Sequence, residues 1–226
     1  RPAQSHAGSV PMADRRDPVL GVAEIALALE SRCKADAKGA QHGVLCGVHF
    51  VSLFPNSPLN IARQANITVS VTSTSDAHRR AVVDGLTKDV DAICKKRELA
   101  CTGGYLLDSN AATSDKRMRE RLSADASAAL KELPAVLDGR AAPPAAPASV
   151  ADVTVPDLWS GTDSDALNLA KRFKTVILHV RHAKGVTHSL AEKVEPSDVA
   201  SASLVLHRFL AGQLLGKAPL KLHDEL

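Results

Sequence analysis

Apolar and polar positions along the first half of the chain follow two periodicities. Two segments repeat an apolar residue every three or four positions, which is the pattern of a helix with one buried face. Ile67, Val69 and Val71 instead alternate with polar residues, which is typical of a half-buried strand. The patterns predict five elements in this order: a helix over 18–33, strands over 44–54 and 67–72, a helix over 77–96 and a strand over 99–107.

This order of elements matches a split β-α-β module that lacks its opening strand. We expect either residues 1–8 or an upstream segment to supply that strand. Residues 1–110 should then form a two-layer α/β module, ferredoxin-like, in which two helices cover an antiparallel sheet. An exposed edge of such a sheet can pair with a second copy across a dimer axis.

The second half, residues 111–226, contains too few strands to form a complete sheet. Its patterns predict helices over 116–133, 164–172 and 196–215 and one strand over 175–180. A stretch rich in proline and alanine predicts an exposed loop over 134–150. Because one strand and its helices cannot close a core alone, we expect an incomplete α/β domain that needs a partner to complete its sheet.

Composition excludes several classes of protein. The chain has 226 residues, of which 45% are hydrophobic and 23% charged, so it can bury a core. The net charge is only +3 and aromatic residues make up 3%, which gives no reason to expect a nucleic-acid partner. No apolar run approaches the roughly 20 residues that a membrane-spanning helix needs.

The cysteines do not form a recognisable metal-binding pattern. Their positions are Cys33, Cys46, Cys94 and Cys101, and no pair has the C-x-x-C spacing of a zinc site. We expect buried or free thiols. The alternative is one disulfide between Cys94, near a helix end, and Cys101 in the following strand.

The C-terminal residues contain a match to a protein-sorting signal. Residues His223, Asp224, Glu225 and Leu226 match a retention signal of the endoplasmic reticulum. The signal acts only on a chain that has entered the secretory route, and no entry signal is visible. The alternative is an organelle that removes a presequence, such as the mitochondrion, with the tetrapeptide then accidental.

One tripeptide, Asn66-Ile67-Thr68, matches the acceptor pattern for N-glycosylation. Such tripeptides occur often by chance. Because this one opens a predicted strand, we expect low occupancy.

Two loops of the second half carry candidate polar groups. His188 follows a predicted buried strand, a place where α/β sheets often present ligands, and it is either a metal ligand or a surface histidine. The loop over 160–165 precedes a helix and could hold a phosphate. Its two aspartates repel anions, so helix capping is the favoured use.

Several stretches occur in an order that resembles one family. They are His6-Ala7-Gly8-Ser9-Val10-Pro11-Met12 followed by Arg15-Arg16-Asp17-Pro18, then Asn60-Ile61, then Gly185-Val186-Thr187-His188-Ser189 with Glu192. The order resembles the dinuclear-metal amidohydrolases of the aminoacylase and carboxypeptidase type, nearest the allantoate and ureido-acid amidohydrolases. The resemblance implies that residues 1–110 are the lid, or dimerisation, domain and that residues 111–226 are the C-terminal portion of the catalytic domain.

The resemblance also implies roles for three residues. His6 would reach into the site of a partner subunit and polarise the scissile group, Asn60 would bind substrate, and His188 would ligate metal. The implied cofactor is a pair of zinc or manganese ions. In the family the other ligands and the general base lie in an N-terminal half, which would precede Arg1, so a chain that supplies this half is an expected partner.

Two departures from the family pattern affect the expected activity. Ser164 stands where the family has a histidine, and Thr72-Ser73-Thr74 stands where an Asp-x-Arg clamps the substrate carboxylate. A hydroxyl cannot replace a permanently charged guanidinium, so Thr72 and Thr74 mark a lost anion clamp.

Three functional hypotheses follow. The first is the C-terminal portion of a metal-dependent C–N amidohydrolase that is incomplete and not catalytic as a lone chain. The second is a degenerate relative that serves as a structural subunit of a larger assembly. The third is an α/β binding module with no inherited site.

Overall fold

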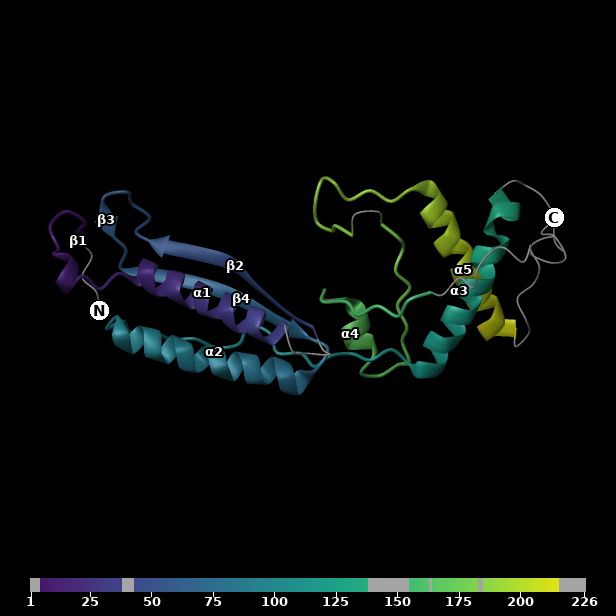
Figure 1. The fold of residues 1–226 in the computed structure, drawn as a ribbon, viewed down its shortest axis with the longest axis horizontal. Helices are drawn as coiled ribbons and strands as arrows, with labels where there is room; N and C mark the ends of the chain where they lie inside the picture. Colours follow the sequence, from purple (N-terminus) through teal and green to yellow (C-terminus); the bar gives the residue numbers. More distant parts are fainter. Residues whose placement is uncertain (1–4, 38–42, 138–154, 163, 183–184, 216–226) are drawn as a thin grey trace. The chain divides into compact units, whose positions relative to one another are not determined.

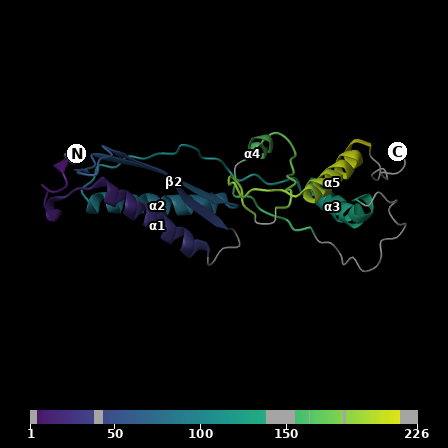
Figure 2. The same ribbon diagram turned by 90° about the horizontal axis from the view of Figure 1, so that it is seen from above.

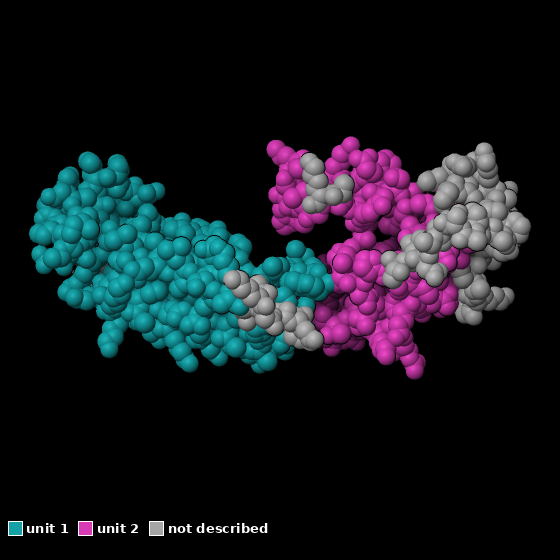
Figure 3. Space-filling view, in the orientation of Figure 1, with its two compact units in different colours: residues 1–111, 159–162 teal, residues 112–158, 163–226 magenta. Residues whose placement is uncertain are grey.

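The computed structural model describes residues 5–37, 43–137, 155–162, 164–182 and 185–215. The chain divides into two compact units, coloured separately in Figure 3. The first comprises residues 1–111 together with 159–162, and the second comprises residues 112–158 and 163–226. The fold is mixed α/β with small antiparallel sheets, as the sequence predicts.

The first unit contains two long helices and two small sheets (Figure 1). Its helices are α1 (Pro18–Ala37) and α2 (Asp76–Lys96), with a short 3-10 helix at Met12–Asp14. Its strands are β1 (Ser5–His6), β2 (Val44–Phe54), β3 (Asn60–Ile61) and β4 (Gln64–Ser73). The two helices and the two long strands predicted from periodicity are confirmed.

Local sequence explains where the helices begin. The Asp17 carboxylate accepts a hydrogen bond from the Val19 amide (2.9 Å), and Pro18 occupies the first helical position, where its missing N–H has no cost. The hydroxyl of Ser75 caps α2 by accepting a hydrogen bond from the His78 amide. The cap of α2 is therefore Ser75, the residue directly before the helix.

The long strands pair antiparallel, with Val48 opposite Val69 and Phe54 opposite Gln64. Both helices pack against one face of this sheet, as Figures 1 and 2 show. The core between the layers is formed by Leu29, Cys33, Val44, Val82 and Leu86. Neither of these two helices covers the other face of the sheet.

The predicted strand over 99–107 is not a strand in the structure, and most of this segment is exposed. A strand forms only where its backbone pairs with a neighbour. Within the part of the chain that the structure describes, only β2 pairs with β4, and β1 pairs with β3 in a separate sheet. The predicted module needs an opening strand to pair with residues 99–107. Residues 5–8 therefore do not supply that strand.

The second unit is built around a pair of long helices. They are α3 (Lys116–Leu137) and α5 (Pro196–Leu215), and a short helix, α4 (Asp165–Leu169), lies between them in sequence. Their shared core is formed by Leu122, Ala126, Ala129, Leu204, Val205 and Phe209. Residues 134–137 of the predicted 134–150 loop continue α3, and the rest of that loop lies outside the described residues.

The predicted strand over 175–180 is also wrong, for the same physical reason. The segment has no strand neighbour among the described residues. Val176 and Leu178 pack against the α3–α5 core, and the Thr175 carbonyl accepts a hydrogen bond from the Asp115 amide (2.8 Å). The segment therefore buries part of its apolar surface against the helices without forming a sheet.

The expectation of free thiols is wrong. Cys33 forms a disulfide with Cys46, and Cys94 forms one with Cys101. The first bond joins the end of α1 to β2, and the second joins the last turn of α2 to the segment that follows it. Sequence spacing could not reveal the Cys33–Cys46 pair, because these two cysteines meet only when α1 packs on the sheet.

No described helix combines the length and the hydropathy needed to cross a bilayer.

Candidate functional site

The structure brings His6 and Asn60 together. β1 and β3 form a short antiparallel ladder in which His6 lies directly opposite Asn60, and Ser5 lies opposite Ile61. The Ala7 amide extends the ladder by donating to the Leu59 carbonyl (2.7 Å). Directly opposed residues share one face of a ladder, with Cβ atoms about 5 Å apart. Two residues implied by separate motifs therefore occupy one small surface.

A tight turn after β1 orients the His6 ring. The Gly8 amide donates to Nδ1 of His6 (3.0 Å), and the Ser9 amide donates to the His6 carbonyl (3.0 Å). A side chain at Gly8 would crowd the ring, because its Cβ would lie 3.3 Å from Nδ1. Since Nδ1 accepts a hydrogen bond, the proton of the neutral ring lies on Nε2. His6 thus presents an N–H donor at its exposed edge.

Arg15 stabilises this turn. Its guanidinium Nη2 donates to the carbonyls of Ala7 and Val10. An arginine bound to two carbonyls of one turn fixes the turn's shape. These contacts give Arg15, in the Arg15-Arg16-Asp17-Pro18 stretch, a structural role in the turn. No contact with substrate is needed to explain its presence.

Asn60 is half-buried beside the turn that precedes β3. Its Nδ2 donates to the Ser57 hydroxyl (3.2 Å), which leaves a second N–H and the carbonyl oxygen without a partner among the described residues. The pair therefore offers two donors, Nε2–H of His6 and one N–H of Asn60. Two donors from opposed residues on one face of a ladder are suited to a carbonyl or carboxylate oxygen.

Thr72 and Thr74 do not join this pair. Asn60 lies four residues before β4 begins, whereas Thr72 lies near the end of β4, roughly 25 Å further along an extended strand. Thr72 pairs with Leu45, and its hydroxyl donates to the Leu45 carbonyl (3.3 Å). No positive charge therefore comes from these two positions.

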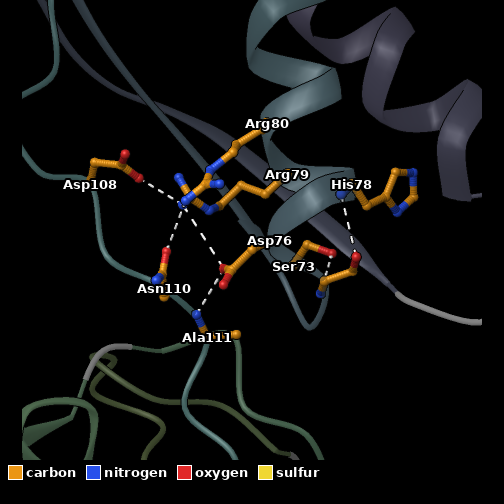
Figure 4. Close-up of polar contacts among 9 residues, drawn as sticks. Ser73, Asp76, His78, Arg79, Arg80, Asp108, Asn110 and Ala111 are labelled. Carbon is orange, nitrogen blue, oxygen red and sulfur yellow. Dashed lines mark hydrogen bonds and ion pairs between the residues drawn. The ribbon is translucent and has the colours of Figure 1, made fainter. Parts of the chain in front are cut away.

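Beyond β4, a buried arginine occupies the start of α2 (Figure 4). Arg79 is 8% exposed, and its Nη2 lies 2.6 Å from Asp108 and 3.9 Å from Asp76. The Asp76 carboxylate also accepts a hydrogen bond from the Ala111 amide (2.9 Å). Because two carboxylates already balance this charge, Arg79 fixes residues 108–111 to α2 and does not replace the lost clamp. The sequence patterns gave no indication of this cluster.

His188 lies in an exposed loop of the second unit. Gly185 and His188 both have positive φ, 59° and 55°, a conformation uncommon for residues other than glycine. The Glu192 carboxylate accepts a hydrogen bond from the His188 amide (2.8 Å), and the Glu192 amide donates to the Ser189 carbonyl (2.9 Å). The backbone around His188 is therefore held in a defined turn.

Ser164 precedes α4 at the capping position, but its hydroxyl makes no capping hydrogen bond. Helix capping, the use favoured for the 160–165 loop, is therefore not carried out by the Ser164 side chain. Instead Ser160 and Thr162 bond to each other, with 2.7 Å between their hydroxyl oxygens.

The described residues do not by themselves fit a pair of metal ions. No group of three histidine, cysteine, aspartate or glutamate side chains among them is placed to hold a metal. His188 is the one position in the second unit that the family pattern marks as a ligand, and a hydroxyl stands at Ser164. A dinuclear site needs several nitrogen and carboxylate ligands around each ion.

Comparison with known proteins gives a consistent set of relatives. No family model matches the chain. Allantoate deiminase of Arabidopsis thaliana is 31% identical over 94% of this chain and 40% of its own length. An N-carbamoyl-L-amino-acid amidohydrolase of Pseudomonas sp. (strain NS671) is 24% identical over 89% of this chain and 43% of its own length.

Solved structures share the fold. A crystal structure of AtUAH in complex with (S)-hydroxyglycine matches with a TM-score of 0.72 and 21% identity, over 90% of this chain and 43% of that one. A hydantoinase/carbamoylase family amidase from Burkholderia vietnamiensis gives the same TM-score, identity and coverage. The chain therefore spans about 40% of the length of the relatives it matches, and corresponds to their C-terminal part.

Proposed function

The chain is a partial homologue of the allantoate deiminases and N-carbamoyl-amino-acid amidohydrolases, and from this premise we propose that it forms the C-terminal part of a metal-dependent C–N amidohydrolase. The substrate class is a ureido or acylamino acid. The observation that carries the proposal is the pairing of His6 with Asn60 across the β1–β3 ladder.

The geometry of this pair suits the reaction. When water adds to a ureido or amide carbonyl, negative charge develops on the carbonyl oxygen. The Nε2–H of His6 donates to that oxygen, while the amide of Asn60 holds a polar group of the same substrate. Their fixed positions mean that little reorganisation is needed as charge develops.

His188 acts as one ligand of the metal pair in this proposal, and the remaining ligands and the general base come from polypeptide outside the described residues. Zinc or manganese would activate the attacking water when bound. A lone chain of these 226 residues is then not catalytic. Its partner supplies the rest of the catalytic half, and a second copy pairs through the first unit.

A structural role is the second candidate, favoured by a specific observation. The positions where the family has a histidine and a carboxylate clamp carry the hydroxyls of Ser164, Thr72 and Thr74. Among the described residues near β4, Arg79 does not compensate, because it is already paired with Asp108. In this alternative the chain is a degenerate amidohydrolase-like subunit that is retained for its surfaces.

The test is ammonia release from allantoate and from N-carbamoyl amino acids by the natively purified protein. Replacing His6 with alanine should lower kcat by roughly 10²–10³-fold, the cost of losing one donor to a developing oxyanion. Replacing His49, which bonds to Ser70 on the long sheet, is the matched control and should leave kcat unchanged. Equal rates for the two variants would contradict the assigned role of His6, and no turnover by the native protein would favour the structural candidate.

A further inference from the structure

Asn66 is a strand residue whose side chain is exposed. It is the third residue of β4 and lies opposite Ser52 of β2. Val69 and Val71 of β4 pack toward α1 and α2, so alternation directs Asn66 to the face that carries no helix. The expectation that a strand position hinders modification therefore does not hold for this face.

The local contacts leave room for a substituent on the Asn66 amide. Nδ2 donates to the Ser52 hydroxyl (3.0 Å), and Oδ1 accepts a hydrogen bond from Nε2 of Gln64 (3.0 Å). An amide nitrogen has two hydrogens, so a group attached at Nδ2 replaces one and leaves the other for Ser52. All three side chains are exposed or partly exposed.

A further observation, independent of Asn66, points to the compartment where such a group is added. The first unit contains the disulfides Cys33–Cys46 and Cys94–Cys101, and disulfides persist mainly in oxidising compartments such as the lumen of the endoplasmic reticulum.

We propose that the chain resides in the lumen of the endoplasmic reticulum and carries an N-linked glycan on Asn66. The donor is an oligosaccharide linked to a lipid through pyrophosphate. A bond forms between Nδ2 of Asn66 and C1 of the first sugar as the bond between C1 and the phosphate oxygen breaks. The amide loses one proton, and the lipid pyrophosphate leaves. Asn66-Ile67-Thr68 is the one acceptor tripeptide in the sequence, so one glycan per chain results.

The surroundings of Asn66 give this glycan a function. Phe50 and Phe54 flank Ser52 on the same face and are 54% and 56% exposed, and both lie diagonally across from Asn66. Exposed aromatic groups on an uncovered sheet favour association with other apolar surfaces. A bulky hydrophilic group at Asn66 covers this patch and keeps it from other chains.

The experiment is peptide mass spectrometry of the full-length protein from its own cells, with and without peptide-N-glycosidase. The enzyme converts a glycosylated asparagine to aspartate, so the peptide that contains residue 66 should carry aspartate only after treatment. An unmodified Asn66 peptide in the native protein would overturn the proposal.

Variants expressed in a eukaryotic secretory host assign the site. Asn66→Gln and Thr68→Ala should both abolish the mobility shift that the glycosidase produces. Thr68→Ser retains the acceptor pattern and should keep the shift, as should Asn60→Gln, which lies outside it. A shift that survives Asn66→Gln would place the glycan elsewhere and contradict the assignment.

Discussion

At the scale of single residues, the distinctive feature is a histidine whose proton position is set by the backbone. The Gly8 amide donates a hydrogen bond to Nδ1 of His6, so the ring is a donor through Nε2. Sequence order alone marked His6 and Asn60 as candidates. It could not show that they are cross-strand neighbours, because a two-residue ladder leaves no periodic pattern to detect.

Other residues were beyond prediction because their partners are distant in sequence. Arg79 is buried between Asp76 and Asp108, and Cys33 meets Cys46 across two layers. A charged residue on a helix is usually exposed, so its burial depends on what the fold places beside it. The amphipathic pattern of α2 does not show that the segment containing Asp108 lies beside Arg79.

One prediction concerns His188. If it ligates a metal, His188→Ala should weaken metal binding by more than about 10-fold, which is the smallest typical cost of perturbing the residues around a metal site. The measurement is zinc and manganese content of the native protein after dialysis at a limiting metal concentration. His207→Ala, on the exposed side of α5, is the control. Unchanged metal content in the His188 variant would remove this residue from the metal site.

At the scale of elements, periodicity predicted the helices and the long hairpin well, because each has one buried face. It failed at residues 99–107 and 175–180. Both segments are rich in apolar residues, and neither has a strand neighbour among the described residues. An apolar stretch indicates that side chains can be buried, whereas strand formation also needs a partner backbone.

The buried face of α1 can be tested by a matched pair of leucines. Leu29 is 2% exposed and packs against Val82 and Leu86, whereas Leu27 on the same helix is 63% exposed. Leu29→Ala should lower the free energy of unfolding by roughly 2–5 kcal/mol, through lost burial and a cavity. Leu27→Ala should change it by less than about 0.5 kcal/mol. Urea denaturation followed by circular dichroism measures both, and similar losses would show that α1 does not pack as described.

The ion pair between α1 and α2 predicts an acid limit to stability. Asp89 accepts hydrogen bonds from the Arg32 guanidinium, with 2.7 Å from Nη2 to Oδ1, and this contact lowers the pKa of Asp89. A lowered pKa in the folded state means that the contribution is present above the unfolded value, about 3.9, and is lost as pH falls through the folded value. Stability of the first unit should therefore decline below about pH 4.

The matched variants for this pH effect are Asp89→Asn and Asp84→Asn on the same helix. Asp84 is exposed and forms no ion pair with a described residue. Thermal unfolding between pH 3 and pH 7 should show a shallower acid decline for Asp89→Asn than for Asp84→Asn. Identical profiles would mean that the Arg32–Asp89 contact does not contribute to stability in solution.

At the scale of the whole molecule, residues with proposed roles lie in both units. The first holds the donors His6 and Asn60, and the second holds His188 in its fixed turn. Family resemblance in the sequence indicated this division of roles. The described residues contain no group of three metal ligands, so the account requires ligands from outside the described residues.

The most direct test of this requirement is native mass spectrometry of the intact particle, with every polypeptide identified and zinc and manganese quantified per copy. We expect a pair of metal ions for each copy of this chain, together with polypeptide that carries the remaining histidine and carboxylate ligands. A metal-free particle in which this chain lies among unrelated subunits would contradict the enzyme account and establish a structural role.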